Sequence, residues 1–149
     1  MKRILIFLFA GSAFLSSCKD DSDDVAPDSV PEAVRTSLLA QFPNAVNVEW
    51  EKAGANYEVD FDIDMIDYDA LMAADGTILK YKHDIQAAEL PETIANALST
   101  SYPDARIEDP EKLYEGQQLY YQVELEGGNA QKLVYSEDGQ QVTTPAYWD

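Results

Sequence analysis

The chain contains one segment twice: VPEAVRTSLLAQFPNA at residues 30–45 and LPETIANALSTSYPDA at residues 90–105. The two copies are 60 residues apart, and their Pro-Glu pairs and the later Pro and Ala residues keep this offset (30 to 90, 45 to 105). In both copies apolar side chains recur every fourth residue, which indicates a helix with one buried stripe. A fixed internal period predicts two copies of one supersecondary unit that share one core.

The ends of both helices are predicted from prolines and polar residues. Ser29 and Glu32 have the S-x-x-E spacing of a capping box, so we expect Ser29 to cap the first helix. Glu89 stands at the corresponding place in the second copy. Pro43 and Pro103 should end the helices, because the residue before a proline is pushed out of the helical region.

After each helix the apolar period changes from four residues to two, which predicts strands. Residues 57–65 alternate apolar and acidic side chains, so one face of this strand should be buried and the other acidic. Residues 121–125 repeat the apolar pattern, and the Asp-Gly pairs at residues 75–76 and 138–139 are predicted hairpin turns. The predicted fold class is α+β: a tandem repeat of a helix followed by about four antiparallel strands, paired into a continuous sheet under two helices.

Residues 1–17 have the composition of a lipoprotein signal peptide. Two basic residues precede an apolar run at residues 4–15, which is too short to span a bilayer comfortably. Residues 15–18, LSSC, resemble the lipobox of bacterial lipoproteins. This resemblance implies cleavage before Cys18 and a diacylglycerol on its thiol, which would hold the chain in a membrane. The alternative is a plain secretory signal that happens to end in a cysteine.

The residues after Cys18 predict where the chain is held. Residues 18–29 are expected to form an acidic tether, because like charges at this density extend a chain. Residues 19–24, KDDSDD, also resemble the surface-export signal of some Gram-negative lipoproteins. We therefore expect an outer-membrane lipoprotein of the cell envelope. Both orientations, facing the periplasm or exposed on the cell surface, agree with these residues. The domain is predicted at residues 30–144, with repeats at 30–85 and 89–144 and an aromatic tail at 145–149.

Composition limits the functions that are open to the chain. The formal net charge is −18, from 28 acidic residues against 10 lysines and arginines. Such a surface repels nucleic acid, so no nucleic-acid partner is expected, and it attracts cations or a basic protein. One cysteine and one histidine are too few for a zinc site, and no cofactor is expected. No nucleophile–base pair can be placed, so we do not expect an enzyme.

Several motifs resemble the PepSY-like family of beta-lactamase-inhibitor-like domains. They are FPNA at residues 42–45, VEWEK at 48–52, YEVDF at 57–61 and DG at 75–76, then YPDA at 102–105, YYQVEL at 120–125 and DG at 138–139. The resemblance spans about residues 29–144. It implies a tandem α+β fold like that of the beta-lactamase inhibitory proteins, and it offers no catalytic residues to carry over.

The aspartate run is a candidate metal site. Asp60, Asp62 and Asp64 alternate along a predicted strand, so their carboxylates should lie on one face about 7 Å apart and could hold calcium weakly. An EF-hand loop that starts at Asp60 is excluded, because Met65 and Leu71 stand where glycine and glutamate are required. The other interpretation is a solvated strand face.

Four aromatic residues outside the predicted core are candidates for partner binding: Tyr114, Tyr120, Tyr147 and Trp148. The alternative for the tail is that it folds back and caps the edge of the sheet. The resulting hypothesis is a lipid-anchored binding module that holds a protein or peptide partner, with inhibition of a hydrolase as one outcome suggested by the fold. The alternative function is a weak calcium-binding protein of the envelope.

Overall fold

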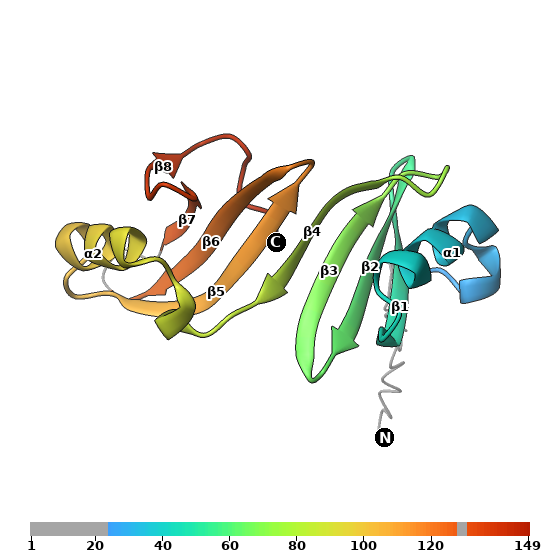
Figure 1. Cartoon of the computed structure of the whole chain (residues 1–149), viewed down its shortest axis with the longest axis horizontal. Helices are drawn as coiled ribbons and strands as arrows, with labels where there is room; N and C mark the ends of the chain where they lie inside the picture. The colour runs from blue at the N-terminus through green and yellow to red at the C-terminus, as the bar shows by residue number, and fades with distance from the viewer. Residues whose placement is uncertain (1–23, 128–130) are drawn as a thin grey trace, which may run out of the picture.

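The computed structural model describes residues 24–127 and 131–149. The strands form one antiparallel sheet of eight, in chain order from β1 to β8, with α1 at one end and α2 at the other (Figure 1). The first half comprises η1 (Pro27–Ser29), α1 (Glu32–Gln41), β1 (Val46–Ala53), β2 (Asn56–Ile63), β3 (Ile66–Met72) and β4 (Ile78–Asp84). The second half comprises η2 (Ala87–Glu89), α2 (Glu92–Ser101), β5 (Arg106–Glu115), β6 (Gln118–Glu126), β7 (Gln131–Ser136) and β8 (Gln141–Val142). The predicted α+β repeat and its continuous sheet are confirmed.

The membrane-related predictions fall largely outside this part of the chain. The predicted signal peptide, Cys18 and most of the tether belong to residues 1–23, which lie outside the described residues. Neither helix that the structure describes has the length and apolar character needed to cross a bilayer.

Both helices lie on the same side of the sheet. Phe61 packs in the cluster under α1, and the cross-strand pairs lead from it through Tyr68, His83 and Lys112 to Tyr121, which packs in the cluster under α2. Residues that pair directly across neighbouring strands point to the same side, so these five side chains share one face. We call the side that neither helix covers the open face. A row of cross-strand partners on it runs Asp60, Asp69, Lys82, Leu113 and Tyr120.

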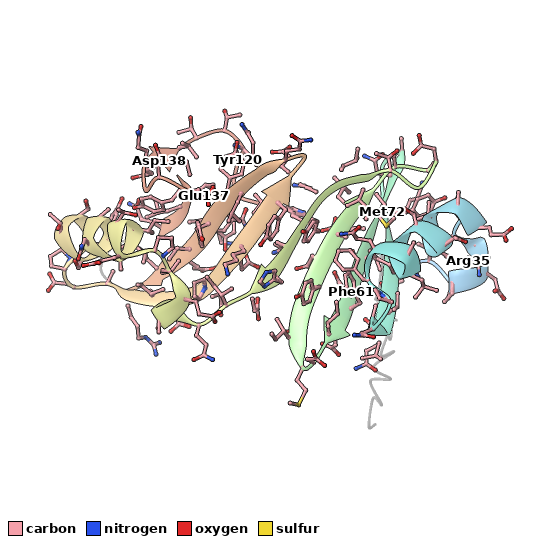
Figure 2. The ribbon with its side chains drawn as sticks, viewed as in Figure 1. Arg35, Phe61, Met72, Tyr120, Glu137 and Asp138 are labelled. Atoms are coloured by element: carbon pink, nitrogen blue, oxygen red, sulfur yellow. The ribbon has the colours of Figure 1, made fainter. Side chains whose placement is uncertain are left out.

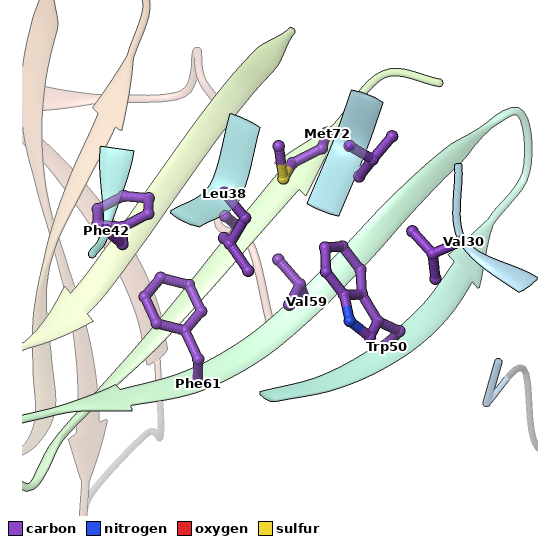
Figure 3. Close-up of a cluster of buried hydrophobic side chains, with 9 residues drawn as sticks. Val30, Leu38, Phe42, Trp50, Val59, Phe61 and Met72 are labelled. Atoms are coloured by element: carbon purple, nitrogen blue, oxygen red, sulfur yellow. The ribbon is translucent and has the colours of Figure 1, made fainter. Parts of the chain in front are cut away.

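Each half has its own hydrophobic core. The predicted stripe Val30, Val34, Leu38 and Phe42 is buried against Trp50 and the inner side chains of β2 and β3 (Figure 3). In the second half the inner side chains of β6 and β7 are buried under α2, whose buried residues are Ile94 and Leu98.

The expectation of one shared core is therefore wrong. Each helix covers only strands of its own half. Between the helices, where β4 meets β5, the rings of Tyr81 and Tyr114 stack at 4.6 Å and join the two halves.

The helices begin differently from the prediction. Pro31 is the N-cap of α1, no side chain caps it, and Ser29 instead ends the short helix η1. Pro91 takes the same place before α2. Proline suits this position because its φ is already near the helical value and it has no N–H group to leave unpaired.

The predicted strand at residues 57–65 ends earlier, at Ile63. Asp64 and Met65 form a two-residue turn to β3, and both have positive φ, 54° and 66°. The side chain of Met65 is consequently 97% exposed. Two positive φ values suit a tight hairpin, and aspartate is common at its first position, but glycine is the usual second residue and Met65 stands there instead.

Replacing Gly76 by alanine should destabilise the chain more than the same change at Gly54. Gly76 has a φ of +93°, and an added Cβ would lie 2.7 Å from the carbonyl oxygen of Ala33 in α1. Gly54 has a φ of +62° but nothing within 4 Å. Both changes carry the left-handed backbone cost of about 1–2 kcal/mol, and Gly76→Ala must also move the helix. We expect urea unfolding to show an additional loss of at least about 1 kcal/mol; equal losses would contradict this packing.

Candidate partner-binding face

In the first half the open face is acidic. Asp60 pairs with Asp69 and Asp62 pairs with Asp67, in each case directly across β2 and β3. These four aspartates line a hollow of about 430 Å³, and Asp84 at the end of β4 lines it as well. Like charges directly opposite each other destabilise a sheet, so this surface favours the approach of positive charge.

The crowding of carboxylates shifts their pKa values. Loss of solvation raises the pKa of Asp60 to about 7, and a hydrogen bond with Asp69 and the charges of Asp69, Glu51 and Glu58 add to the rise. Loss of solvation likewise raises the pKa of Asp84 to about 6, with the charge of Glu111 as the next cause. Some carboxyls of the open face therefore retain protons at a pH where ordinary aspartates have lost them.

Stability should fall as the pH rises from about 4 to about 7. In this window folded Asp60 still binds a proton that the unfolded chain has released, because its folded pKa is about 7 and its ordinary value is 3.8. Asp84 acts in the same direction up to about pH 6. Since the Asp60 side chain is exposed, screening limits its effect to about 1 kcal/mol. We expect the melting temperature to be higher near pH 5 than near pH 7.5 and the Asp60→Asn variant to show a flatter profile; an unchanged slope in the variant would contradict it.

The predicted metal residues do not lie together. Asp60 and Asp62 point to the open face, whereas Asp64 lies in the turn after β2. Within residues 24–127 and 131–149, no three Asp, Glu, His or Cys side chains are placed to hold a metal ion. Calcium binding stays a prediction that this part of the chain does not strengthen.

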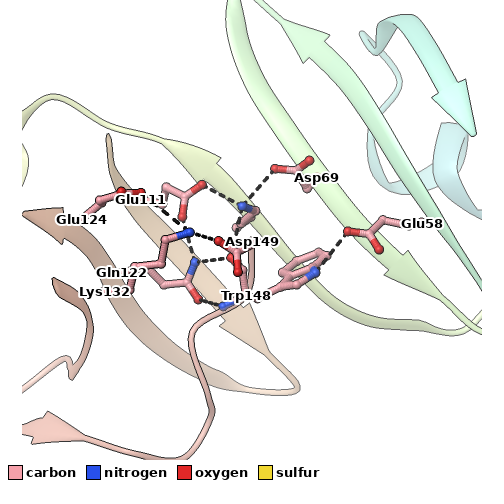
Figure 4. Close-up of polar contacts among 9 residues, drawn as sticks. Glu58, Asp69, Glu111, Gln122, Glu124, Lys132, Trp148 and Asp149 are labelled. Carbon is pink, nitrogen blue, oxygen red and sulfur yellow. Dashed lines mark hydrogen bonds and ion pairs between the residues drawn. The ribbon is translucent and has the colours of Figure 1, made fainter. Parts of the chain in front are cut away.

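In the second half the chain's own C-terminal tail crosses the open face. The side-chain amide of Gln122 on β6 makes two hydrogen bonds to the backbone of Trp148 (Figure 4). Its Oε1 accepts from the Trp148 N–H group at 2.8 Å, and its Nε2 donates to the Trp148 carbonyl at 2.9 Å. Lys82 Nζ on β4 donates to the same carbonyl at 3.2 Å. The indole N–H of Trp148 donates to Glu58 on β2 at 3.1 Å. The tail thus connects strands of both halves.

A nearly buried ion pair lies beside this tail. Lys82 Nζ is 2.9 Å from Glu111 and 3.5 Å from Asp69, and the side chains of Lys82 and Glu111 are each 8% exposed. Gln122 also donates to Glu111 at 2.7 Å. Burial alone would lower the pKa of Lys82, but its hydrogen bonds and ion pairs with these carboxylates outweigh burial and raise it. Lys82 is therefore charged in the folded chain.

The tail also explains buried apolar residues on the open face. Leu113 and Val134 are buried but belong to neither core cluster. Val134 lies beside the tail residues Pro145 and Tyr147, and Leu113 is the cross-strand partner of Lys82. We infer that the tail, rather than a helix, removes these two side chains from water.

The four predicted partner-binding aromatics lie in different places. Tyr114 points to the helix side, where it stacks on Tyr81. Tyr120 lines a hollow of about 500 Å³ near Glu137 and Asp138 (Figure 2). Tyr147 and Trp148 lie on the open face. The tail does fold back, but over the sheet face rather than along an edge, and partner binding by these residues stays a prediction.

Sequence reasoning missed Lys82, Glu111 and Gln122. Each belongs to the polar half of an alternating strand, and such residues are expected to be solvated. Nothing local in the sequence indicates that a tail from beyond β8 covers them. The Trp148 indole beyond the last predicted strand was the one available signal, since a tryptophan seldom remains in water without a contact.

Comparison with solved structures shows the same fold in several Bacteroides proteins. A BLIP-like protein from Bacteroides fragilis matches with a TM-score of 0.67 and 24% identity, covering 75% of this chain and 83% of that one. A protein described as a "putative periplasmic" protein from Bacteroides eggerthii matches with a TM-score of 0.71 and 18% identity, covering 76% and 86%. A DUF2874 family protein from Bacteroides uniformis matches with a TM-score of 0.70 and 19% identity, covering 75% of this chain and 86% of that one.

Comparison with curated proteins gave no match. A family profile does match, at residues 17–80 and again at residues 77–142, so its two copies together span most of the chain. Its description is "Putative beta-lactamase-inhibitor-like, PepSY-like". The two matches correspond to the two helix-and-sheet halves, and the chain belongs to the PepSY-like family.

Proposed function

We propose that this chain is a binding module of the cell envelope, anchored by a lipid on Cys18, that holds a protein partner with a basic surface against its open face. The observation that carries the proposal is the open face of the first half, where paired carboxylates of β2 and β3 stand uncovered by either helix. Family membership and the fold support a binding role rather than catalysis. Inhibition of a hydrolase would be one consequence of such binding.

A basic partner suits this surface for two physical reasons. A lysine or arginine side chain placed beside Asp60 and Asp69 would favour the charged form of Asp60 and pair with it. The large negative charge of the chain would also speed the encounter with a positive surface.

The lone histidine lies on the helix side of the sheet, away from the open face. Its ring stacks on Tyr68 at 4.9 Å, and Nδ1 of His83 is 3.0 Å from the backbone carbonyl oxygen of Asp84. These contacts hold the imidazole in place, so it is not part of the surface proposed to meet the partner.

The test is affinity capture from the envelope of the source bacterium. Capture is done at about pH 8, above the pKa of Asp60 (about 7) and that of Asp84 (about 6), where both carboxyls are mostly charged. The variant Asp60→Asn/Asp69→Asn/Asp84→Asn should then lose the captured partner by about tenfold or more, because it removes nearly three charges from the open face. The matched control, Glu32→Gln/Glu92→Gln/Asp104→Asn, removes the same charge from exposed positions away from that face. Equal capture by the two variants would refute the proposal. Because Asp69 also pairs with Lys82, circular dichroism must show that both variants are folded before their capture is compared.

A further inference from the structure

The tail is held in the way that a peptide-binding protein holds a ligand. Gln122 is completely buried, and its side-chain amide pairs with both backbone groups of Trp148. This reciprocal pairing reproduces what a neighbouring β-strand offers an extended peptide. Without the tail, the Gln122 amide would keep its hydrogen bond to Glu111 but lose both backbone partners, so an extended segment that offers an N–H and a carbonyl can restore them.

The side chains around the tail select a particular chemistry. The Trp148 ring has Lys80 Nζ 4.0 Å from its centroid, and its indole N–H donates to Glu58. The lysine contact requires an aromatic ring, and a side chain that also donates a hydrogen bond to Glu58 from that ring is a tryptophan here. Lys132 pairs with the Asp149 carboxylate and lies 5.1 Å from the centroid of the Tyr147 ring. The site therefore fits an aromatic residue that is directly followed by an acidic one.

Three lysines gather here in a chain that has only 10 lysines and arginines in total. Lys80, Lys82 and Lys132 all contact the last residues of the tail. Lys82 is already paired with Glu111 and Asp69, so Lys80 and Lys132 are the cations at this site that a bound segment contacts without competing for that pair. The acidic residue of a bound segment would pair with Lys132, as Asp149 does, and the carboxylates of the first half would repel it from the neighbouring part of the open face.

Most of the tail before Tyr147 is exposed, and the specific polar contacts come at its end. β8 ends at Val142, and Thr143, Thr144 and Ala146 are exposed. The polar contacts of the tail are made by Trp148 and Asp149. A segment from another protein with the same two side chains could make all of them.

We propose that Gln122, Glu58, Lys80, Lys82 and Lys132 form a binding site for an extended peptide segment of the partner protein, in which a tryptophan precedes an acidic residue. The chain's own tail occupies this site until the partner displaces it. The inference rests on the proposed function, because it names the partner segment that reaches the open face. Since the tail is tethered, its effective concentration is in the millimolar range, and a free peptide must overcome that advantage.

The test uses the full chain with fluorotryptophan in place of its two tryptophans, Trp50 and Trp148. The probe is an unlabelled peptide with the sequence of residues 143–149, TTPAYWD, and the control peptide is TTPAYAD. Fluorine NMR should show the Trp148 signal moving as TTPAYWD is added, while the signal of buried Trp50 stays in place. TTPAYAD should move neither signal. A Trp148 signal that stays in place at millimolar peptide would overturn the proposal.

A second measurement uses a variant with the tail contact removed. Fluorescein-labelled TTPAYWD should bind Trp148→Ala about tenfold or more tightly than wild type, because the tethered competitor is weakened. Adding Gln122→Leu should reverse that gain. Equal binding by Trp148→Ala and wild type would count against the site; if Trp148→Ala does not fold, the NMR titration on the wild-type chain decides. Should both tests fail while capture still depends on the open-face aspartates, only this inference is lost.

Discussion

Replacing Lys82 by methionine is expected to lower the free energy of unfolding by about 3–5 kcal/mol. The change keeps most of the side-chain volume but removes the positive charge between Glu111 and Asp69. Glu111 would then be buried without its cation, and the carbonyl of Trp148 would lose one of its two donors. Urea unfolding followed by circular dichroism measures the loss.

A neighbouring lysine provides the control for this prediction. Lys112 lies on the other face of the sheet and forms no ion pair within the residues that the structure describes. Lys112→Met should therefore change stability by less than about 1 kcal/mol. In the double variant Lys82→Met/Glu111→Leu much of the loss should return, because no buried charge is left alone. A loss below about 1 kcal/mol for Lys82→Met would show that the pair is solvated.

Leu38→Ala and Leu98→Ala are each expected to cost about 2–5 kcal/mol. Both leucines are almost completely buried, at 1% and 2% exposure, and each lies at the centre of its own cluster. Because the clusters are separate, the losses should add to within about 0.5 kcal/mol in the double variant.

The additivity is the informative part of the leucine prediction. Thermal and urea unfolding of both single variants and the double variant would form a complete cycle. A coupling energy above about 1 kcal/mol would mean that the two halves share a core after all. Leu39→Ala, on the exposed side of α1 with 53% of its side chain accessible, is the matched control and should change little.

The repeated parts of the fold could be predicted from sequence. The four-residue stripe ending at Phe42, the alternation around Val59 and both Asp-Gly turns appear in the structure where the sequence predicts them. Each of these depends on local periodicity and turn chemistry, which a single sequence expresses directly.

The remaining features depend on contacts between distant residues. Lys82 and Glu111 come from different repeats, and the bond from Trp148 to Glu58 joins residues 90 positions apart. Two irregularities of the backbone could not be predicted from the sequence either. β1 and β5 each carry a register shift, with positive φ at Asn47 and Asp109. Neither position carries glycine, so no residue type marks the bulge in advance.

Site-specific photo-crosslinking in the bacterial envelope tests most directly whether the open face is the partner-binding face. A benzoylphenylalanine at Asp67, exposed on the open face, should crosslink to the captured partner. The same group at Leu39, exposed on α1, should not. Crosslinks from Leu39 without crosslinks from Asp67 would contradict the account.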